Sequence, residues 1–137
     1  MSKIHPSLFL RCALLGDAAA SGATGFLMFA GAGFLTELLG LPETLLRVAG
    51  IVLIPYAAAI AYLGTREVLS RWIVWAVITA NAVWVADSTL LLVSGWVSRT
   101  IFGTTFVVFQ AVVVAAFAEA QFIGLRRAER AIAAAMA

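Results

Sequence analysis

Four long apolar stretches, separated by short polar connections, dominate the pattern of hydrophobic and polar positions along this chain. A helix needs about 20 mostly apolar residues to cross the hydrocarbon core of a bilayer, and its backbone hydrogen bonds then form within the segment. The pattern therefore predicts an all-α membrane protein, a four-helix transmembrane bundle that forms a single domain. The stretches cover residues 12–36, 44–64, 72–94 and 100–124 of the 137.

The connections between the stretches contain residues that commonly end or begin helices. Gly40 and Gly95 follow the first and third stretches, and Pro42 precedes the second. Since these connections are short, successive helices should pack antiparallel. Residues 125–137, rich in Arg and Ala, are expected to form either a helical extension of the fourth span or a frayed tail on the membrane surface.

Composition agrees with a membrane protein, and the distribution of charge predicts the orientation of the bundle in the membrane. Hydrophobic residues make up 64% of the chain and charged residues 12%, against about 45–50% and roughly 25% in soluble domains. Seven Lys or Arg residues lie on the side shared by both termini and the middle connection, and two lie on the other side. The positive-inside rule then predicts that both termini are cytoplasmic. The seven are Lys3, Arg11, Arg66, Arg71, Arg126, Arg127 and Arg130, and the two are Arg47 and Arg99.

These basic residues are spread over the ends of the apolar stretches and form no single basic face, so a nucleic-acid partner is not expected. The expected partner is the lipid bilayer.

A cleaved signal peptide is the alternative interpretation of the first stretch, with residues 30–32 near the cleavage site. The apolar region of a signal peptide is normally about 7–15 residues long. The first stretch is longer, so a transmembrane span is the favoured interpretation.

The two halves of the chain resemble each other at an offset of 60 residues. Residues 61–66 (AYLGTR) close the second span, and residues 121–126 (QFIGLR) close the fourth. The same offset pairs Ser21 with Asn81. This pattern indicates a possible tandem repeat of a helical hairpin about an axis along the membrane normal. The alternative is that helices ending at a basic interface share such residues without a common origin.

Ionisable side chains within the spans are candidates for function because they are costly in lipid. Asp17 and Glu119 should both lie toward the side of the termini, at similar depth. If they are neighbours, the two carboxyl groups could share one proton. The alternative, which we favour, is that each pairs with an arginine at the interface. The candidate arginines are Arg11, Arg66 and Arg126.

A second polar layer is expected near the middle of the membrane. Asn81, Trp84 and Ser88 recur at helical spacing and share one face of the third span, with Asp87 one residue off that face. These residues predict either a small polar pocket with an aromatic wall or hydrogen bonds that hold the helices together. The candidate pocket residues from both layers are Asp17, Ser21, Tyr56, Asn81, Trp84, Asp87, Gln110 and Glu119.

The sequence contains no recognisable catalytic set and gives no indication of a cofactor. His5 is the only histidine and Cys12 the only cysteine. A haem would therefore need a ligand other than histidine, or a second chain, and a disulfide within one chain is impossible. An enzyme is not expected.

Three segments of the chain resemble a family of uncharacterised bacterial membrane proteins with four spans. The segments are residues 45–50 (LLRVAG), 81–88 (NAVWVADS) and 118–127 (AEAQFIGLRR). In size and number of spans the chain is also similar to the DoxX-like proteins, although it shares no motif with them. The resemblance implies a location in the bacterial inner membrane and brings no activity or functional residues with it.

The leading functional hypothesis is a non-enzymatic membrane protein that acts by association, as a homo-oligomer or an accessory subunit of a larger membrane complex. Small residues at helical spacing in the first span, such as Ser21 and Gly25, would allow another helix to approach closely. The alternative is a carrier of a small molecule or ion that uses the polar residues within the membrane.

Overall fold

The computed structural model describes residues 3–137, and this part of the chain is almost entirely helical. Within it lie α1 (Leu8–Ala30), α2 (Ala32–Leu39), α3 (Glu43–Thr65), α4 (Arg71–Ser94) and α5 (Ile101–Met136). Two short strands, β1 (Lys3–Ile4) and β2 (Leu69–Ser70), pair antiparallel. Helices α1, α3, α4 and α5 are long and apolar enough to cross a membrane. The chain is thus a multi-pass membrane protein, as the hydrophobic pattern predicted.

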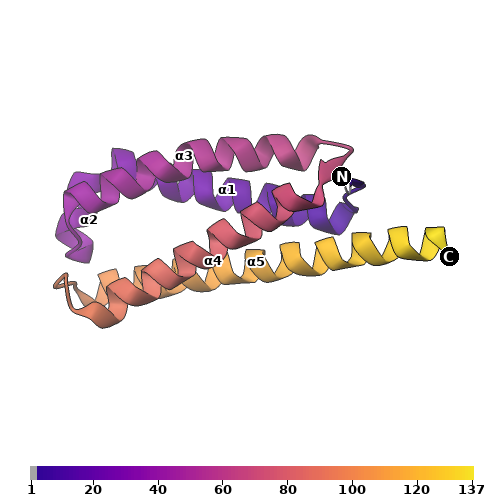
Figure 1. The fold of residues 1–137 in the computed structure, drawn as a ribbon. Coiled ribbons are helices and arrows are strands. Elements are labelled where there is room, and N and C mark those ends of the chain that lie inside the picture. Colours follow the sequence, from indigo (N-terminus) through magenta and orange to yellow (C-terminus); the bar gives the residue numbers. More distant parts are fainter. Residues whose placement is uncertain (1–2) are drawn as a thin grey trace.

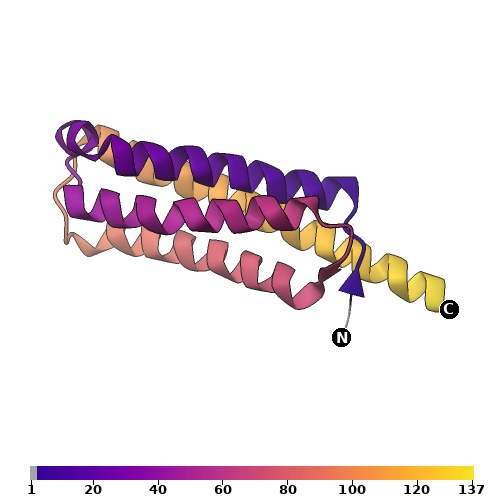
Figure 2. The same ribbon diagram turned by 90° about the horizontal axis from the view of Figure 1, so that it is seen from above.

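The four long helices form two antiparallel hairpins that lie side by side. Helix α1 packs along α3, α4 packs along α5, and α5 also lies against α1 (Figures 1 and 2). Both termini lie at the same end of the bundle, while α2 lies at the other (Figure 1). Helices α3 and α4 are closest near the connection at residues 66–70 and diverge toward the α2 end (Figure 1).

Close packing between α1 and α3 depends on small residues at regular spacing. The buried positions of α3 recur at intervals of three and four residues and include Gly50 and Gly64. A Cβ atom placed on Gly50 would lie only 2.6 Å from the backbone oxygen of Gly25. The two helix backbones therefore approach each other directly at this point, as small residues allow in membrane bundles.

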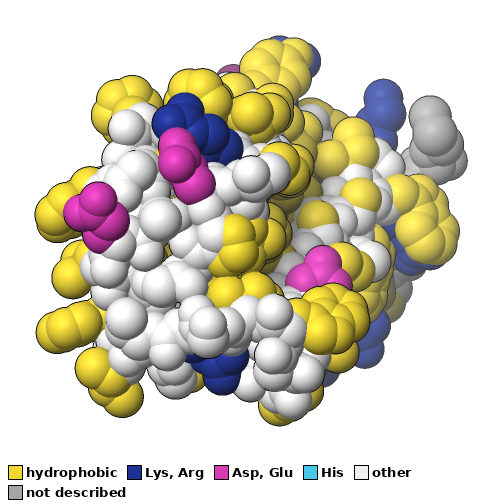
Figure 3. All heavy atoms as spheres, turned by 90° about the vertical axis from the view of Figure 1, so that its left-hand side faces the viewer, with side chains coloured by type: hydrophobic (Ala, Val, Ile, Leu, Met, Phe, Trp, Pro, Cys, Tyr) yellow, Lys and Arg dark blue, Asp and Glu magenta, His cyan; other side chains and the backbone are white. Residues whose placement is uncertain are grey.

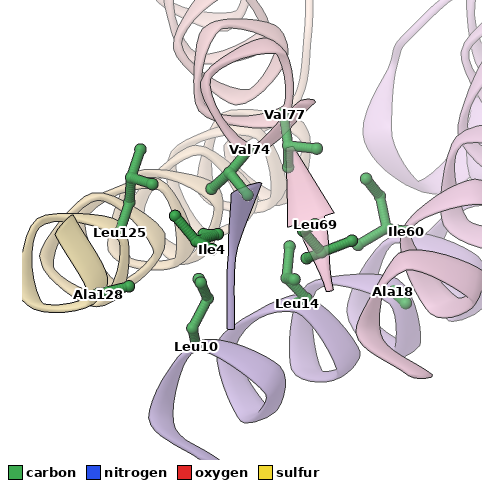
Figure 4. Packing of buried hydrophobic residues seen from close by; sticks show 10 residues of the cluster. All are labelled: Ile4, Leu10, Leu14, Ala18, Ile60, Leu69, Val74, Val77, Leu125 and Ala128. Carbon is green, nitrogen blue, oxygen red and sulfur yellow. The ribbon is translucent and has the colours of Figure 1, made fainter. Parts of the chain in front are cut away.

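A hydrophobic cluster closes the bundle at the end that carries the termini. Strand β1 pairs with β2 there, and Ile4 and Leu69 are both buried. The Ile4 side chain lies among residues from α1, α4 and α5, including Leu10, Val74 and Leu125 (Figure 4). The segment before α1 thus contributes to the core.

At the opposite end the first apolar stretch is divided, whereas a single span over residues 12–36 was expected. Helix α1 ends at Ala30, and α2 begins at Ala32 after a turn at Gly31. At the far end of α2, the Thr100 amide and hydroxyl donate to the backbone oxygens of Leu39 and Leu38, at 3.0 and 2.8 Å. Helix α2 therefore folds across the end of the bundle to reach the start of α5 and does not lengthen α1.

The last helix is longer than a single membrane crossing. Helix α5 continues without a break to Met136, so residues 125–136 extend the fourth span, one of the two forms expected for residues 125–137. In Figure 1 this extension passes beyond the other helices at the end that carries the termini. Its Glu129 carboxylate lies 3.8 Å from the Arg71 guanidinium and 3.5 Å from that of Arg126, so the base of the extension is joined to α4 by charge.

Candidate functional site

One buried carboxylate lies at the centre of the bundle. Asp17 of α1 is fully buried, and its Oδ2 atom accepts hydrogen bonds from side chains of the three other long helices. The Tyr56 hydroxyl lies 3.1 Å away, the Asn81 amide nitrogen 2.9 Å and the Gln121 amide nitrogen 2.8 Å. The Ser21 hydroxyl, one turn along α1, donates to Oδ1 at 3.0 Å.

The donors around Asp17 also bind one another. The Asn81 amide nitrogen donates to Gln121 Oε1 at 3.0 Å, and the Tyr56 hydroxyl lies 2.8 Å from Asn81 Oδ1. The single Tyr56 proton can thus be directed to Asn81 or to Asp17. We call these five residues (Asp17, Ser21, Tyr56, Asn81 and Gln121) the aspartate network. It connects α1, α3, α4 and α5 through hydrogen bonds alone.

Hydrogen-bond donors, and no cation, surround this carboxylate. Over residues 3–137 the structure gives Asp17 no ion pair with Lys or Arg. An isolated carboxylate in an apolar medium is costly, and the donors offset that cost because they direct partial positive charge at the oxygens. Within residues 3–137 the Ser21 hydroxyl is the hydrogen-bonding partner of Oδ1, and a hydroxyl can accept a hydrogen bond as well as donate one.

A second polar cluster joins α4 to α5 closer to the α2 end. The Trp84 indole nitrogen donates to Gln110 Oε1 at 2.6 Å, and the Gln110 amide nitrogen donates to the Ser88 hydroxyl oxygen at 2.9 Å. The Ser88 hydroxyl in turn donates to the Trp84 backbone oxygen at 2.8 Å. These bonds hold the Trp84 ring in a fixed orientation beside the space between the hairpins.

A groove of about 710 Å³ lies between α3 and α4, which diverge from the end that carries the termini. Most of its lining is apolar, and α1 and α5 contribute its floor. Viewed from the α2 end, hydrophobic side chains gather around a hollow on that face of the molecule (Figure 3). The polar and aromatic residues that line the groove are Ser21, Tyr56, Asn81, Trp84, Asp87, Ser88, Trp96, Phe106 and Gln110.

Asp17 lies behind this lining and borders a smaller cavity of about 130 Å³ between α1 and α5. Ser21, Trp84 and Gln110 border both spaces. The Trp84–Gln110 hydrogen bond therefore lies at the boundary between the groove and the smaller cavity.

Comparison with known proteins identifies no relative. No protein family, curated protein or solved structure matches this chain. Its function is therefore inferred from the groove and the polar residues beneath it.

Six of the eight candidate pocket residues line the groove, and Asp17 lies directly behind it. The remaining one, Glu119, is exposed on α5 and borders neither space. The pairing of Asp17 with Glu119 is therefore wrong, since Gln121 occupies the position beside Asp17. The alternative pairing with arginine is also absent from the described residues. Arg126 binds Glu129, and Arg66 lies over the Tyr62 ring.

Gln121 was the important residue that sequence reasoning missed. Its helical phase identifies it, because Gln121 lies eleven residues, about three turns, after Gln110. Gly124 and Ala128, three and seven residues further on, continue the same face and are buried in the bundle. Glu119 lies two residues before Gln121, on the opposite side of the helix. Depth alone suggested Glu119, whereas phase selects Gln121.

Proposed function

We propose that this chain binds a small lipid-soluble molecule, with an apolar body and a hydrogen-bonding group, in the groove between α3 and α4. The observation that carries the proposal is the position of the groove: α3 packs on α1 and α4 on α5, so the space between them is open on the side that would face lipid. Its volume lies within the range of about 300–1,000 Å³ that is typical of ligand pockets.

The distribution of polarity in the groove supports such a molecule. Val52 of α3 and Val83 of α4 line the groove and are also exposed at its margin, so the entrance is apolar. Tyr56, Asn81 and Gln110 lie deeper; their O–H and N–H groups already bind within the protein, and their oxygens can accept a further hydrogen bond from a ligand. A molecule that enters from the bilayer would thus keep its body in apolar surroundings and find partners for its polar group at the floor.

The orientation in the membrane belongs to the same proposal. The two termini and the connection between α3 and α4 are together and carry seven basic residues, against two at the other end. By the positive-inside rule we assign that end to the cytoplasm, and by resemblance we assign the chain to a bacterial inner membrane. Gly64 and Gly124 lie 60 residues apart in the sequence. A Cβ atom on Gly64 would meet Leu15 of α1, and a Cβ atom on Gly124 would meet Leu10 of the same helix. In a tandem repeat of the hairpin, Gly124 would meet α4 as Gly64 meets α1, so the proposed repeat rests on the 60-residue offset in the sequence alone.

Photolabelling in lipid nanodiscs tests the groove directly. The probe is a neutral alkylphenol that carries a diazirine, and the labelled positions are mapped by peptide mass spectrometry. We expect saturable labelling of α3 and α4 at the groove, reduced several-fold by Ala80→Phe, because Ala80 lines the groove and a phenyl ring would occupy part of it. Ala82→Phe, exposed on the same helix away from the groove, is the matched control. Unsaturable labelling spread over every lipid-facing surface, equal in both variants, would contradict the proposal.

Association remains a second candidate function because of Glu119. Its side chain is exposed on α5 near the level of the aspartate network, and the structure gives it no hydrogen bond or ion pair over residues 3–137. A carboxylate that faces lipid is costly, and a second copy of the chain that covers it would lower that cost. The candidate is therefore a homo-oligomer that forms along this face of α5.

The mass of the protein in mild detergent and in nanodiscs tests this candidate. We expect an oligomer that Glu119→Leu converts largely to monomer, because leucine removes the polar contact between copies. Glu119→Gln keeps a hydrogen-bonding group of the same size and should remain associated. A monomeric mass for the unmodified chain in both environments would rule out self-association.

A further inference from the structure

The charged side chain that lines the groove between α3 and α4 is acidic. Asp87 of α4 lines it, and the groove lining contains no Lys or Arg. Over residues 3–137 the structure gives the Asp87 carboxylate no ion pair, and its side chain is exposed. Asp17 adds a second acidic group behind the floor of the groove. The space is therefore apolar over most of its surface and acidic where it is charged.

The two arginines at this end of the bundle have other partners. Arg47 binds Glu43, with guanidinium and carboxylate atoms 2.6 Å apart. The Arg99 guanidinium donates to the backbone oxygen of Leu92 at 2.6 Å and to the Thr104 hydroxyl at 3.0 Å. Arg99 thus stabilises the end of α4, whose last carbonyl groups have no partner within the helix. Neither arginine neutralises Asp87.

Aromatic rings surround the same space. Tyr56, Trp84, Trp96 and Phe106 all line the groove. The face of an aromatic ring attracts a cation, most strongly when water is excluded, and tryptophan is the most effective of these rings. A carboxylate beside several aromatic rings in an apolar groove favours a molecule that combines positive charge with a large apolar surface.

We propose that the occupant of the groove is an apolar organic cation, such as a lipophilic amine, with Asp87 as its counter-ion. This inference rests on the proposed function and names its ligand class. The charged group would lie near Asp87, which is seven residues or roughly 10 Å from the end of α4, and a hydrogen-bonding group elsewhere in the molecule would reach the floor at Tyr56 and Asn81. The apolar body would extend between α3 and α4, and the Trp84 ring, held by Gln110, would form one wall.

Competition between two ions of nearly equal shape and opposite charge tests the inference. Tetraphenylphosphonium and tetraphenylborate are each titrated against the alkylphenol photoprobe in nanodiscs of phosphatidylcholine, for the unmodified chain and for Asp87→Asn. Each ion partitions into the same bilayer for both proteins, so the ratio between the proteins isolates the effect of Asp87. Glu119→Gln, which removes a carboxylate outside the groove, is the matched control. Because Asp87 is exposed and unpaired, the thermal midpoint of Asp87→Asn should equal that of the parent.

We expect Asp87→Asn to raise the phosphonium concentration needed for half-displacement about tenfold, which corresponds to about 1.4 kcal/mol. The borate concentration should stay constant or fall, and Glu119→Gln should change neither value. Equal displacement by phosphonium in the parent and Asp87→Asn would overturn the cation inference while groove binding stands. Absence of saturable groove labelling by the photoprobe alone would overturn the proposed function, and this inference with it.

Discussion

Asp17→Leu is expected to lower the free energy of unfolding by about 2 kcal/mol, whereas Asp17→Asn should leave the bundle at least as stable as the parent. The leucine removes an acceptor shared by Tyr56, Asn81 and Gln121. Hydrogen bonds between helices in lipid contribute roughly 0.6 kcal/mol each, so the loss of three gives this estimate.

Asparagine preserves these bonds while it removes the charge. Its oxygen can replace Oδ2 and accept from the same three donors, and its amide nitrogen can donate to the Ser21 hydroxyl, which is the hydrogen-bonding partner of Oδ1. The parent would hold a charge without a neighbouring cation, so its removal has no cost in ion pairing.

Unfolding by sodium dodecyl sulfate in mixed micelles, followed by circular dichroism, measures both variants. Ala19→Leu, an exposed position on the same helix, controls for the effect of a larger apolar side chain. Equal destabilisation by Asp17→Leu and Asp17→Asn would show that the charge itself, and not the pattern of donors and acceptors, stabilises the centre of the bundle.

Gly50→Ala is the second substitution with a large expected effect, a loss of roughly 1–3 kcal/mol from overpacking. The new methyl group would lie 2.6 Å from the Gly25 oxygen and 2.8 Å from the Phe29 nitrogen. Both are backbone atoms of α1, so no side-chain rotation can relieve the contact, and α3 must move away from α1. The higher helix propensity of alanine, worth about 1 kcal/mol, offsets only part of this loss.

Two glycines of the same chain provide matched controls for Gly50→Ala. A methyl group on Gly33 would meet no atom within 4 Å, and one on Gly22 would make an ordinary contact at 3.4 Å with Ala57. Gly33→Ala and Gly22→Ala should therefore be neutral or slightly stabilising in the same unfolding experiment. A neutral Gly50→Ala would mean that α1 and α3 do not approach at backbone distance.

The number of membrane-spanning helices and one polar face followed from the sequence because they depend on local properties. The length and hydropathy of a segment decide whether it can cross a bilayer. Spacing along one helix is equally local, so Asn81, Trp84 and Ser88 fall together at the groove as expected. Where a helix turns is harder to predict: Gly31 lies within an unbroken apolar stretch, and the contact of α2 with Leu39 and Thr100 is made only in the folded bundle.

The composition of the aspartate network depended on relations between helices. Depth in the membrane places Asp17 near both Glu119 and Gln121, and only the rotation of α5 about its axis decides which one faces inward. That rotation is set by close contacts such as the one between Gly124 and Leu10. The groove is likewise a property of the pair of hairpins, since it exists where α3 and α4 separate.

The connection at residues 66–70 has a geometric consequence for any occupant. Only five residues join α3 to α4, so these helices cannot part at that end, while nothing as short joins them at the other. The space between them is thus a wedge that narrows toward the termini. An elongated molecule would enter with its slender end leading toward Tyr56 and Asn81. Its bulkiest part would stay at the wide mouth, beside Trp96 and Asp87. The taper therefore selects one of the two possible orientations of such a molecule.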